Sequence, residues 1–200
     1  MIAAVIFDMD GLLIDSEQVW DDVREALAHE RGGRWHPGAQ RDMMGMSSPE
    51  WSRYMHDRIG LAESPELINR IVVERMLDRY AQGPPWLAGA REAVARLGAV
   101  FTLGLASSSN RELIDRVLDA GGISSAFEAT VSSEEVAAGK PAPDVYLEAC
   151  RRIGIRPERS LAIEDSLAGA RAACTGMQQS RDLKAYDVQG MHKRIAEAVI

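Results

Sequence analysis

The sequence predicts an α/β fold that has a parallel sheet core, helices on both faces of the sheet and an inserted all-helical cap. Short apolar runs alternate with helical patterns, which is typical of right-handed βαβ units around a parallel sheet. Ala3–Phe7 is short and apolar throughout, as expected of a strand that is buried on both faces. Residues 16–85 interrupt this alternation with patterns that are almost entirely helical, which predicts the cap.

Four segments are candidate strands. Ala3–Phe7 is apolar throughout and stops at Asp8, and Phe101–Ala106 stops at a run of serines. Ala129–Val131 is a weaker candidate, and Ser160–Ile163 leads into a pair of acidic residues. Because parallel strands end at one edge of a sheet, we expect the polar residues that follow them to converge there.

Helices are predicted between and after these strands from apolar spacing and from glycine and proline punctuation. The predicted helices are Glu17–Arg31, Pro49–Ile59, Pro65–Ala81, Glu112–Ala120 and Pro143–Ile153.

The first three predicted helices would form the cap, residues 16–85, with hinges near Asp15 and at Pro84-Pro85. Residues 1–15 and 86–200 would then form a discontinuous, Rossmann-like core. Three of the four tryptophans and several methionines lie in the cap. They could line a substrate pocket, but such residues more often form a small helical core, and we expect the core.

Composition excludes some functions and partners. The 200 residues include 30 acids and 23 bases, a net charge of −7, which argues against nucleic acid or an anionic membrane as partner. The two cysteines match no metal-binding spacing and imply no disulfide framework. The N-terminus does not resemble a signal peptide, and no apolar stretch approaches the roughly 20 residues that span a bilayer. We expect a cytoplasmic protein that is a monomer or a weak homodimer.

The first polar signal is Asp8-Met9-Asp10-Gly11, directly after the first strand. In an extended segment the side chains of Asp8 and Asp10 point the same way, so both carboxylates can face one site. Gly11 lets the chain turn away without a Cβ. The alternative is that the aspartates only end the strand in a solvated loop.

Two further signals suit an anionic group. Hydroxyls and free N–H groups in Ser107–Asn110 can bind an anion at a helix N-terminus, although the same residues are also ordinary helix caps. Pro141 restrains Lys140 to an extended backbone, which aims a cationic side chain from a stiff loop. A single lysine is otherwise usually a solvated surface charge.

The fourth signal is Glu164-Asp165-Ser166, at the end of the last predicted strand. Acidic side chains in a buried position require a cation, and oxygen ligands suit a hard ion such as Mg²⁺. A helix cap formed by Asp165 or Ser166 is the alternative. In order along the chain, the four signals supply a nucleophile, an acid/base, a phosphate clamp and a metal site, which is the equipment for phosphoryl transfer.

The chain resembles the haloacid dehalogenase superfamily of phosphohydrolases, in the subgroup that has a helical cap after the first strand and includes β-phosphoglucomutase and sugar-phosphate phosphatases. The resemblance covers roughly residues 1–177. Its four motifs are FDMDGLLIDSE (7–17), LASSS (105–109), GKPAPDVY (139–146) and IEDSLAGARAA (163–173).

The resemblance implies a function for each motif. Asp8 would attack the substrate phosphorus and form an aspartyl phosphate, and Asp10 would act as general acid and then general base. Ser107, the Ser108 N–H and Lys140 would hold the phosphoryl oxygens. The implied metal site for Mg²⁺ consists of the Asp8 carboxylate, the Asp10 backbone carbonyl and Asp165, with support from Glu164.

Two departures from the subgroup favour hydrolysis of a small phosphorylated metabolite over isomerisation. Mutase-like members have a histidine early in the first cap helix, where this chain has Trp20. They also have a cap arginine just after a G-x-S segment, where this chain has Ser48. A phosphoglucomutase-type isomerase and a catalytically silent binding module remain the alternatives. Expected substrate contacts in the cap are Trp20, Arg41, Met46 and Arg53.

A third departure concerns the C-terminus. Family members usually continue after the fourth motif with a short apolar strand, whereas residues 178–184 here are mostly polar. We expect that residues 178–188 form no well-paired edge strand, so that residues 178–200 or another subunit would cover the sheet edge.

Overall fold

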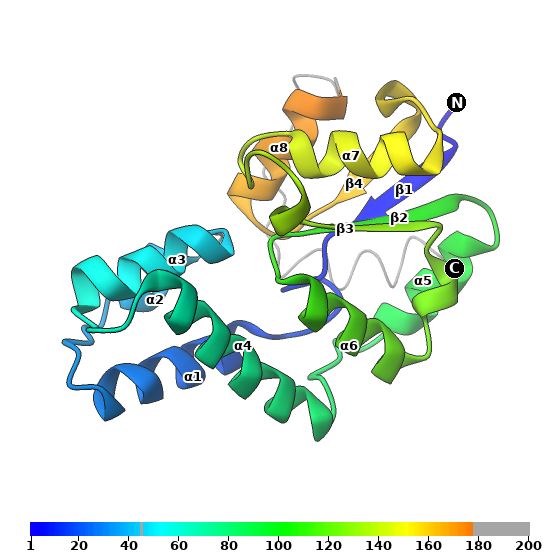
Figure 1. Ribbon diagram of the computed structural model, residues 1–200. Coiled ribbons are helices and arrows are strands. Elements are labelled where there is room, and N and C mark those ends of the chain that lie inside the picture. The colour runs from blue at the N-terminus through cyan, green and yellow to red at the C-terminus, as the bar shows by residue number, and fades with distance from the viewer. Residues whose placement is uncertain (45, 178–200) are drawn as a thin grey trace.

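The computed structural model describes residues 1–44 and 46–177. Its strands are all parallel and lie in the spatial order β3-β2-β1-β4 (Figure 1). They are β1 (Ala4–Phe7), β2 (Thr102–Ser107), β3 (Ala129–Ser132) and β4 (Ser160–Ile163). Each differs from its predicted range by at most one residue at either end, and the predicted α/β class with a parallel sheet is confirmed.

Helices cover both faces of the sheet, and the alternation of side chains along β1 shows why. Val5 and Phe7 point into one apolar cluster and Ile6 into the other. Figure 1 shows the two helical layers on opposite sides of the strands. The first cluster includes side chains of α5 (Ala90–Gly98) and α6 (Arg111–Gly121), and the second includes side chains of α7 (Asp144–Ile153) and α8 (Leu167–Met177).

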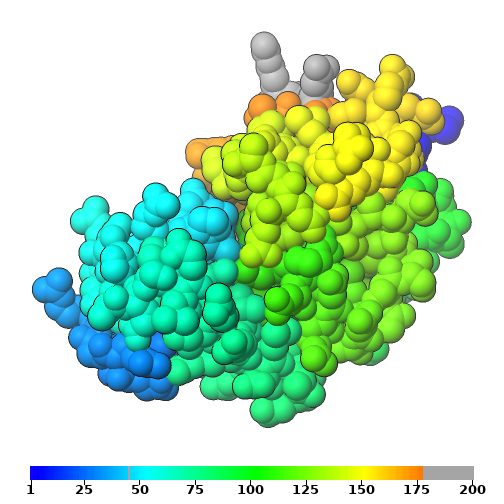
Figure 2. All heavy atoms as spheres, viewed as in Figure 1, coloured from blue at the N-terminus to red at the C-terminus, as the bar shows by residue number. Residues whose placement is uncertain are grey.

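In the part of the chain that the structure describes, the segment between β1 and α5 is helical and contributes no strand to the sheet, and in Figure 1 this blue-to-teal segment lies to one side of the sheet. Figure 2 shows its atoms packed directly against the green atoms of the core. The helices of this segment are α1 (Glu17–Glu30), α2 (Ala39–Met43), α3 (Ser48–Tyr54), the π-helical turn Met55–Ile59 and α4 (Pro65–Ala81). Elsewhere in the described residues, short 3₁₀ turns lie at Ser124–Ala126, Ser133–Glu135 and Pro157–Arg159.

The two chain crossings between this segment and the core run side by side. Asp15 N donates to Pro85 O at 2.8 Å, and Leu87 N donates to Leu13 O at 3.0 Å. The crossings coincide with the predicted hinge positions, while the assignment of residues 16–85 as a cap domain stays a prediction. The expected absence of an edge strand concerns residues 178–188, which lie outside the described residues.

The described helices include none that is both long enough and apolar enough to cross a membrane.

Candidate active site

A cavity of about 120 Å³ lies between the carboxyl ends of the strands and the helices that follow β1. The core side is lined by residues from all four sequence motifs, and the other side by residues of α1 to α3. The core residues that line it are Asp8, Asp10, Ser108, Ser109, Lys140, Asp165 and Ser166. Segments that are more than 150 residues apart in sequence therefore meet at one edge of the sheet, as the parallel topology predicts.

Asp8, at the end of β1, is held by a buried lysine. Lys140 Nζ donates to Asp8 Oδ1 at 2.8 Å and also to Glu164 Oε1. Tyr146, from α7, donates its hydroxyl to the same Glu164 oxygen at 2.5 Å. Lys140 and Asp8 are only 5% and 6% exposed, so neither charge is stable there without the other. Lys140 is therefore not a solvated surface charge, while the predicted role of Pro141 in aiming it stays a prediction.

Asp10 accepts hydrogen bonds at both carboxylate oxygens. Ser16 Oγ and Trp20 Nε1 donate to Oδ1, the latter at 3.2 Å. Ser109 Oγ donates to Oδ2 at 2.6 Å, and Ser107 Oγ makes a longer contact of 3.4 Å with the same oxygen. Donors at the start of α1 and around the end of β2 therefore fix the orientation of this carboxylate.

Gly11 allows the first and fourth motifs to approach each other. Its φ is +71°, and a Cβ at this position would lie 1.9 Å from Asp165 Oδ2. Any other residue would therefore be strained in its backbone and would collide with Asp165.

An acidic cluster lies beside Gly11. Asp8, Glu164 and Asp165 each offer one carboxylate oxygen, and these oxygens lie within 4.8 Å of one another. Burial raises the pKa of Asp8 well above its usual range, and Glu164, Asp165 and Asp10 raise it further against the opposing charge of Lys140. Burial and Glu164 raise the pKa of Asp165 to about 7. Such a concentration of oxygen donors fits a hard divalent cation.

The raised pKa of Asp165 predicts how the stability of metal-free protein depends on pH. The folded-state pKa is about 7 and the ordinary value is 3.8, so the folded state binds more protons between these values. The contribution of Asp165 is fully present below pH 3.8 and is lost as the pH rises through 7. We expect Asp165→Asn to become more stable relative to wild type across this interval. Urea unfolding at several pH values measures the difference, and a difference independent of pH would contradict the assignment.

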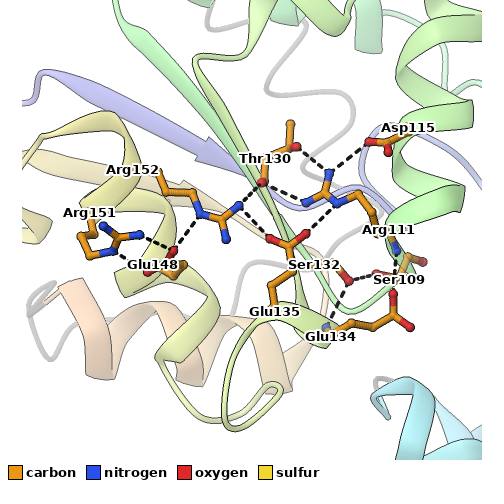
Figure 3. Close-up of polar contacts among 10 residues, drawn as sticks. All are labelled: Ser109, Arg111, Asp115, Thr130, Ser132, Glu134, Glu135, Glu148, Arg151 and Arg152. Carbon is orange, nitrogen blue, oxygen red and sulfur yellow. Dashed lines mark hydrogen bonds and ion pairs between the residues drawn. The ribbon is translucent and has the colours of Figure 1, made fainter.

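A polar network anchors the loop that follows β2 (Figure 3). Ser132 Oγ, from β3, donates to the Ser109 carbonyl at 2.7 Å and accepts from Glu134 N. The Glu134 carboxylate in turn accepts from Arg111 N at 2.9 Å, at the start of α6. Arg111 also pairs with Glu135. These contacts fix the loop that carries Ser108 and Ser109, directly after Ser107 at the end of β2.

The predicted phosphate-binding serines have different environments. Ser108 lines the cavity, and its carbonyl accepts from Ser133 Oγ at 2.9 Å. Ser107 is fully buried and does not line the cavity, because its hydroxyl lies under the loop and accepts from Ser109 N at 3.0 Å. Its proposed contact with a phosphoryl oxygen stays a prediction.

The predicted cap contacts divide into two pairs. Trp20 and Met46 line the cavity, whereas Arg41 and Arg53 are exposed and do not line it. The expectation that cap tryptophans and methionines form a helical core holds for Met55, which is buried, but it is incomplete. Trp51 and Met43 are buried and also line the cavity.

Sequence reasoning missed several residues around the cavity. Ser16 and Ser109 contact Asp10, and Arg24 lines the cavity from α1. A signal for two of them was present, because Ser16, Trp20 and Arg24 are spaced four residues apart and so share one helix face.

Comparison with known proteins gives one family and several named relatives. The model of the haloacid dehalogenase-like hydrolases matches residues 2–173. Hexitol phosphatase B of Escherichia coli K12 is 33% identical over 194 residues, which cover 94% of this chain and 86% of the relative. The phosphorylated carbohydrates phosphatase of Thermotoga maritima is 30% identical over 174 residues, covering 85% of this chain and 79% of the relative.

Solved structures agree with the family match. CbbY of Rhodobacter sphaeroides in complex with phosphate has a TM-score of 0.80 at 25% identity, over 95% of this chain and 92% of that one. A complex of CbbY with xylulose-(1,5)-bisphosphate has a TM-score of 0.79 at 26% identity, over 89% of this chain and 84% of that one. The fold of this chain is therefore shared with these relatives.

Proposed function

Because this chain belongs to the haloacid dehalogenase-like hydrolases, we propose that it is a Mg²⁺-dependent phosphatase that hydrolyses a small sugar phosphate through an aspartyl phosphate on Asp8. The hexitol phosphatase and carbohydrate phosphatase relatives support the reaction and the substrate class. One observation carries the proposed mechanism: the cavity is lined by the Asp8 carboxylate, with Lys140 Nζ 2.8 Å away and the oriented carboxylate of Asp10 beside it.

In the first step an oxygen of Asp8 forms a bond to the substrate phosphorus, and the bond from phosphorus to the ester oxygen breaks. Asp10 gives its proton to the departing alkoxide. In the second step Asp10 takes a proton from water, whose oxygen bonds to phosphorus and releases phosphate from Asp8. The donors Ser16, Trp20 and Ser109 would keep the Asp10 carboxylate in place for both transfers.

Charge on the phosphoryl group would be balanced by groups at the edge of the sheet. Lys140 is a fixed cation beside Asp8, and the Ser108 N–H and Ser107 are proposed to donate to the phosphoryl oxygens. Lys140 would also reduce repulsion between the Asp8 carboxylate and an anionic substrate.

The acidic cluster fits Mg²⁺, since its donors are carboxylate oxygens from buried or half-buried residues. Asp8, Asp165 and the Asp10 backbone carbonyl would hold the ion. Both oxygens of Glu164 already accept hydrogen bonds, from Lys140, Tyr146 and Ser166, so Glu164 would support the site and orient its neighbours. The bound ion would supply positive charge that offsets repulsion between carboxylates and phosphate.

Residues 16–85 would act as a cap that closes over the substrate and excludes water, with hinges at the paired crossings near Asp15 and Pro85. The cytoplasmic location, the lack of a nucleic-acid partner and the monomeric or weakly dimeric state stay predictions from composition.

The test is an assay on p-nitrophenyl phosphate with and without metal. We expect chelation to lower turnover by about 10²-fold or more and Mg²⁺ to restore it, because the carboxylates repel the substrate without a cation. Full activity after complete removal of metal would contradict the metal requirement. A panel of sugar and nucleotide monophosphates then gives the substrate class.

Product analysis separates the alternatives. With β-glucose 1-phosphate, release of phosphate supports hydrolysis, whereas formation of glucose 6-phosphate would identify a mutase. No turnover of any phosphate ester, together with tight ligand binding, would identify a silent binding module.

A further inference from the structure

Arg24 is a buried cation in the wall of the cavity. It lies on α1, one turn after Trp20, and is 8% exposed. Its guanidinium carbon lies 4.6 Å from the ring centroid of Trp20 and 4.7 Å from that of Trp51. The two indoles are neighbours, with ring centroids 5.9 Å apart. Cation–π contacts with two rings therefore hold the guanidinium in one place at the cavity.

The hydrogen-bonding capacity of this guanidinium is unused. Within residues 1–44 and 46–177, Arg24 makes no hydrogen bond and no salt bridge, and its buried Nε has no partner. A guanidinium has five N–H donors and no acceptor, so its complement is an acceptor oxygen. Burial lowers the pKa of Arg24 to about 10, which leaves it charged at neutral pH. The donors of Arg24 thus have no acceptor among the described residues and are available to a ligand.

The surroundings of Arg24 indicate which acceptor fits. Glu17, Asp21 and Asp10 line the same cavity, and the charges of Asp21 and Asp10 act on Arg24 directly. A second anionic group on the ligand beside Arg24 would be repelled by Asp21 and Asp10, the two carboxylates whose charges act on this guanidinium. A hydroxyl group can instead accept from a guanidinium and donate to a carboxylate at the same time. Gln40, also in the wall, adds an amide that both donates and accepts.

We propose that Arg24, together with Asp21, is a specificity-determining site for the hydroxyl groups of the alcohol portion of the substrate. The substrates are then monophosphates of neutral polyols or sugars, and bisphosphates and phosphorylated acids are disfavoured. This assignment rests on the proposed phosphatase function, since it concerns the part of the substrate beyond the phosphoryl group.

Three probes test the assignment on the full-length protein. Sorbitol 6-phosphate and 6-phosphogluconate differ only at the carbon farthest from the phosphate. This carbon is a hydroxymethyl group in sorbitol 6-phosphate and a carboxylate in 6-phosphogluconate. Acetyl phosphate carries none of the hydroxyl groups that Arg24 is proposed to bind. We expect wild type to prefer sorbitol 6-phosphate over 6-phosphogluconate by at least about tenfold in kcat/KM. Arg24→Met should lower kcat/KM for sorbitol 6-phosphate by about 10–100-fold, mainly through KM, and change acetyl phosphate turnover less than about threefold.

Two further variants separate recognition from structure. Arg24→Lys keeps the charge but loses the forked donors, so we expect an intermediate loss on sorbitol 6-phosphate. Arg79→Met is the matched control, because Arg79 is an exposed arginine of α4 outside the cavity, and it should change neither probe.

The contradicting outcomes are distinct. Equal losses of Arg24→Met on sorbitol 6-phosphate and acetyl phosphate would show a structural role and overturn the assignment alone. The assignment would also be overturned if wild type preferred 6-phosphogluconate, or if it had equal kcat/KM for sorbitol 6-phosphate and 6-phosphogluconate. Wild type that turns over none of the three would overturn the phosphatase proposal and, with it, the assignment.

Discussion

Asp8→Asn is expected to lower kcat by about 10³-fold or more while the protein stays folded, because an amide cannot form the acyl phosphate on which the mechanism depends. The side chain lies at the end of a strand whose core contacts do not involve the carboxylate, and the amide can still accept a hydrogen bond from Lys140. Steady-state turnover of a phosphate monoester measures the loss, and circular dichroism confirms the fold.

Asp22→Asn is the control for this substitution. Asp22 lies on α1, is exposed and does not line the cavity. Its carboxylate accepts a hydrogen bond from Gln18 at 2.7 Å. Its turnover should stay within about twofold of wild type. Near-full activity of Asp8→Asn would contradict the assignment of Asp8 as the nucleophile.

Lys140→Met is expected to affect both stability and turnover. The lysine is buried with Asp8 and Glu164, so its removal leaves two carboxylates without their cation. Breaking a buried ion pair in this way typically lowers the free energy of unfolding by about 3–5 kcal/mol. Loss of the cation beside the phosphoryl group should also lower kcat by about 10²-fold or more. Urea denaturation of metal-free protein and steady-state kinetics measure the two effects.

The double variant Lys140→Met/Glu164→Gln identifies the cause of the stability loss. Removal of one uncompensated carboxylate should restore part of the unfolding free energy lost in Lys140→Met. Strictly additive losses would mean that Lys140 and Glu164 are not coupled, contrary to their contact.

The strands were predictable because their signal is local. Ala4–Phe7 is apolar at every position and ends at a charged residue, so both its type and its end are readable from a few residues. Helix α4, Pro65–Ala81, was predicted with its observed bounds because Gly83-Pro84-Pro85 marks its end, and in the structure Ser64 caps its first turn. Helix α2, with five residues, is too short to show a period. Helix α5 was missed although Ala90 and Val94 show helical spacing.

The sequence could predict the part of the site whose residues are positioned by the strand topology alone. Parallel strands bring their carboxyl ends together, so the convergence of Asp8, Lys140 and Asp165 followed from their places after strands. The side of the cavity formed by the helices did not follow, because helix packing decides which residues face inward. Arg41 and Arg53 were expected to contact the substrate, but both are exposed and lie outside the cavity lining. Arg24 was missed, since its burial depends on two tryptophans from different helices.

The aspartyl phosphate on Asp8 is the central claim, and chemical trapping tests it most directly. The protein is quenched during turnover and treated with borohydride, which reduces an acyl phosphate to an alcohol. The tryptic peptide Met1–Arg24, which contains Asp8, is then sequenced by mass spectrometry. We predict that Asp8 is converted to homoserine only when substrate is present. Reduction at another carboxylate, or an unmodified Asp8 under conditions of full turnover, would contradict the claim.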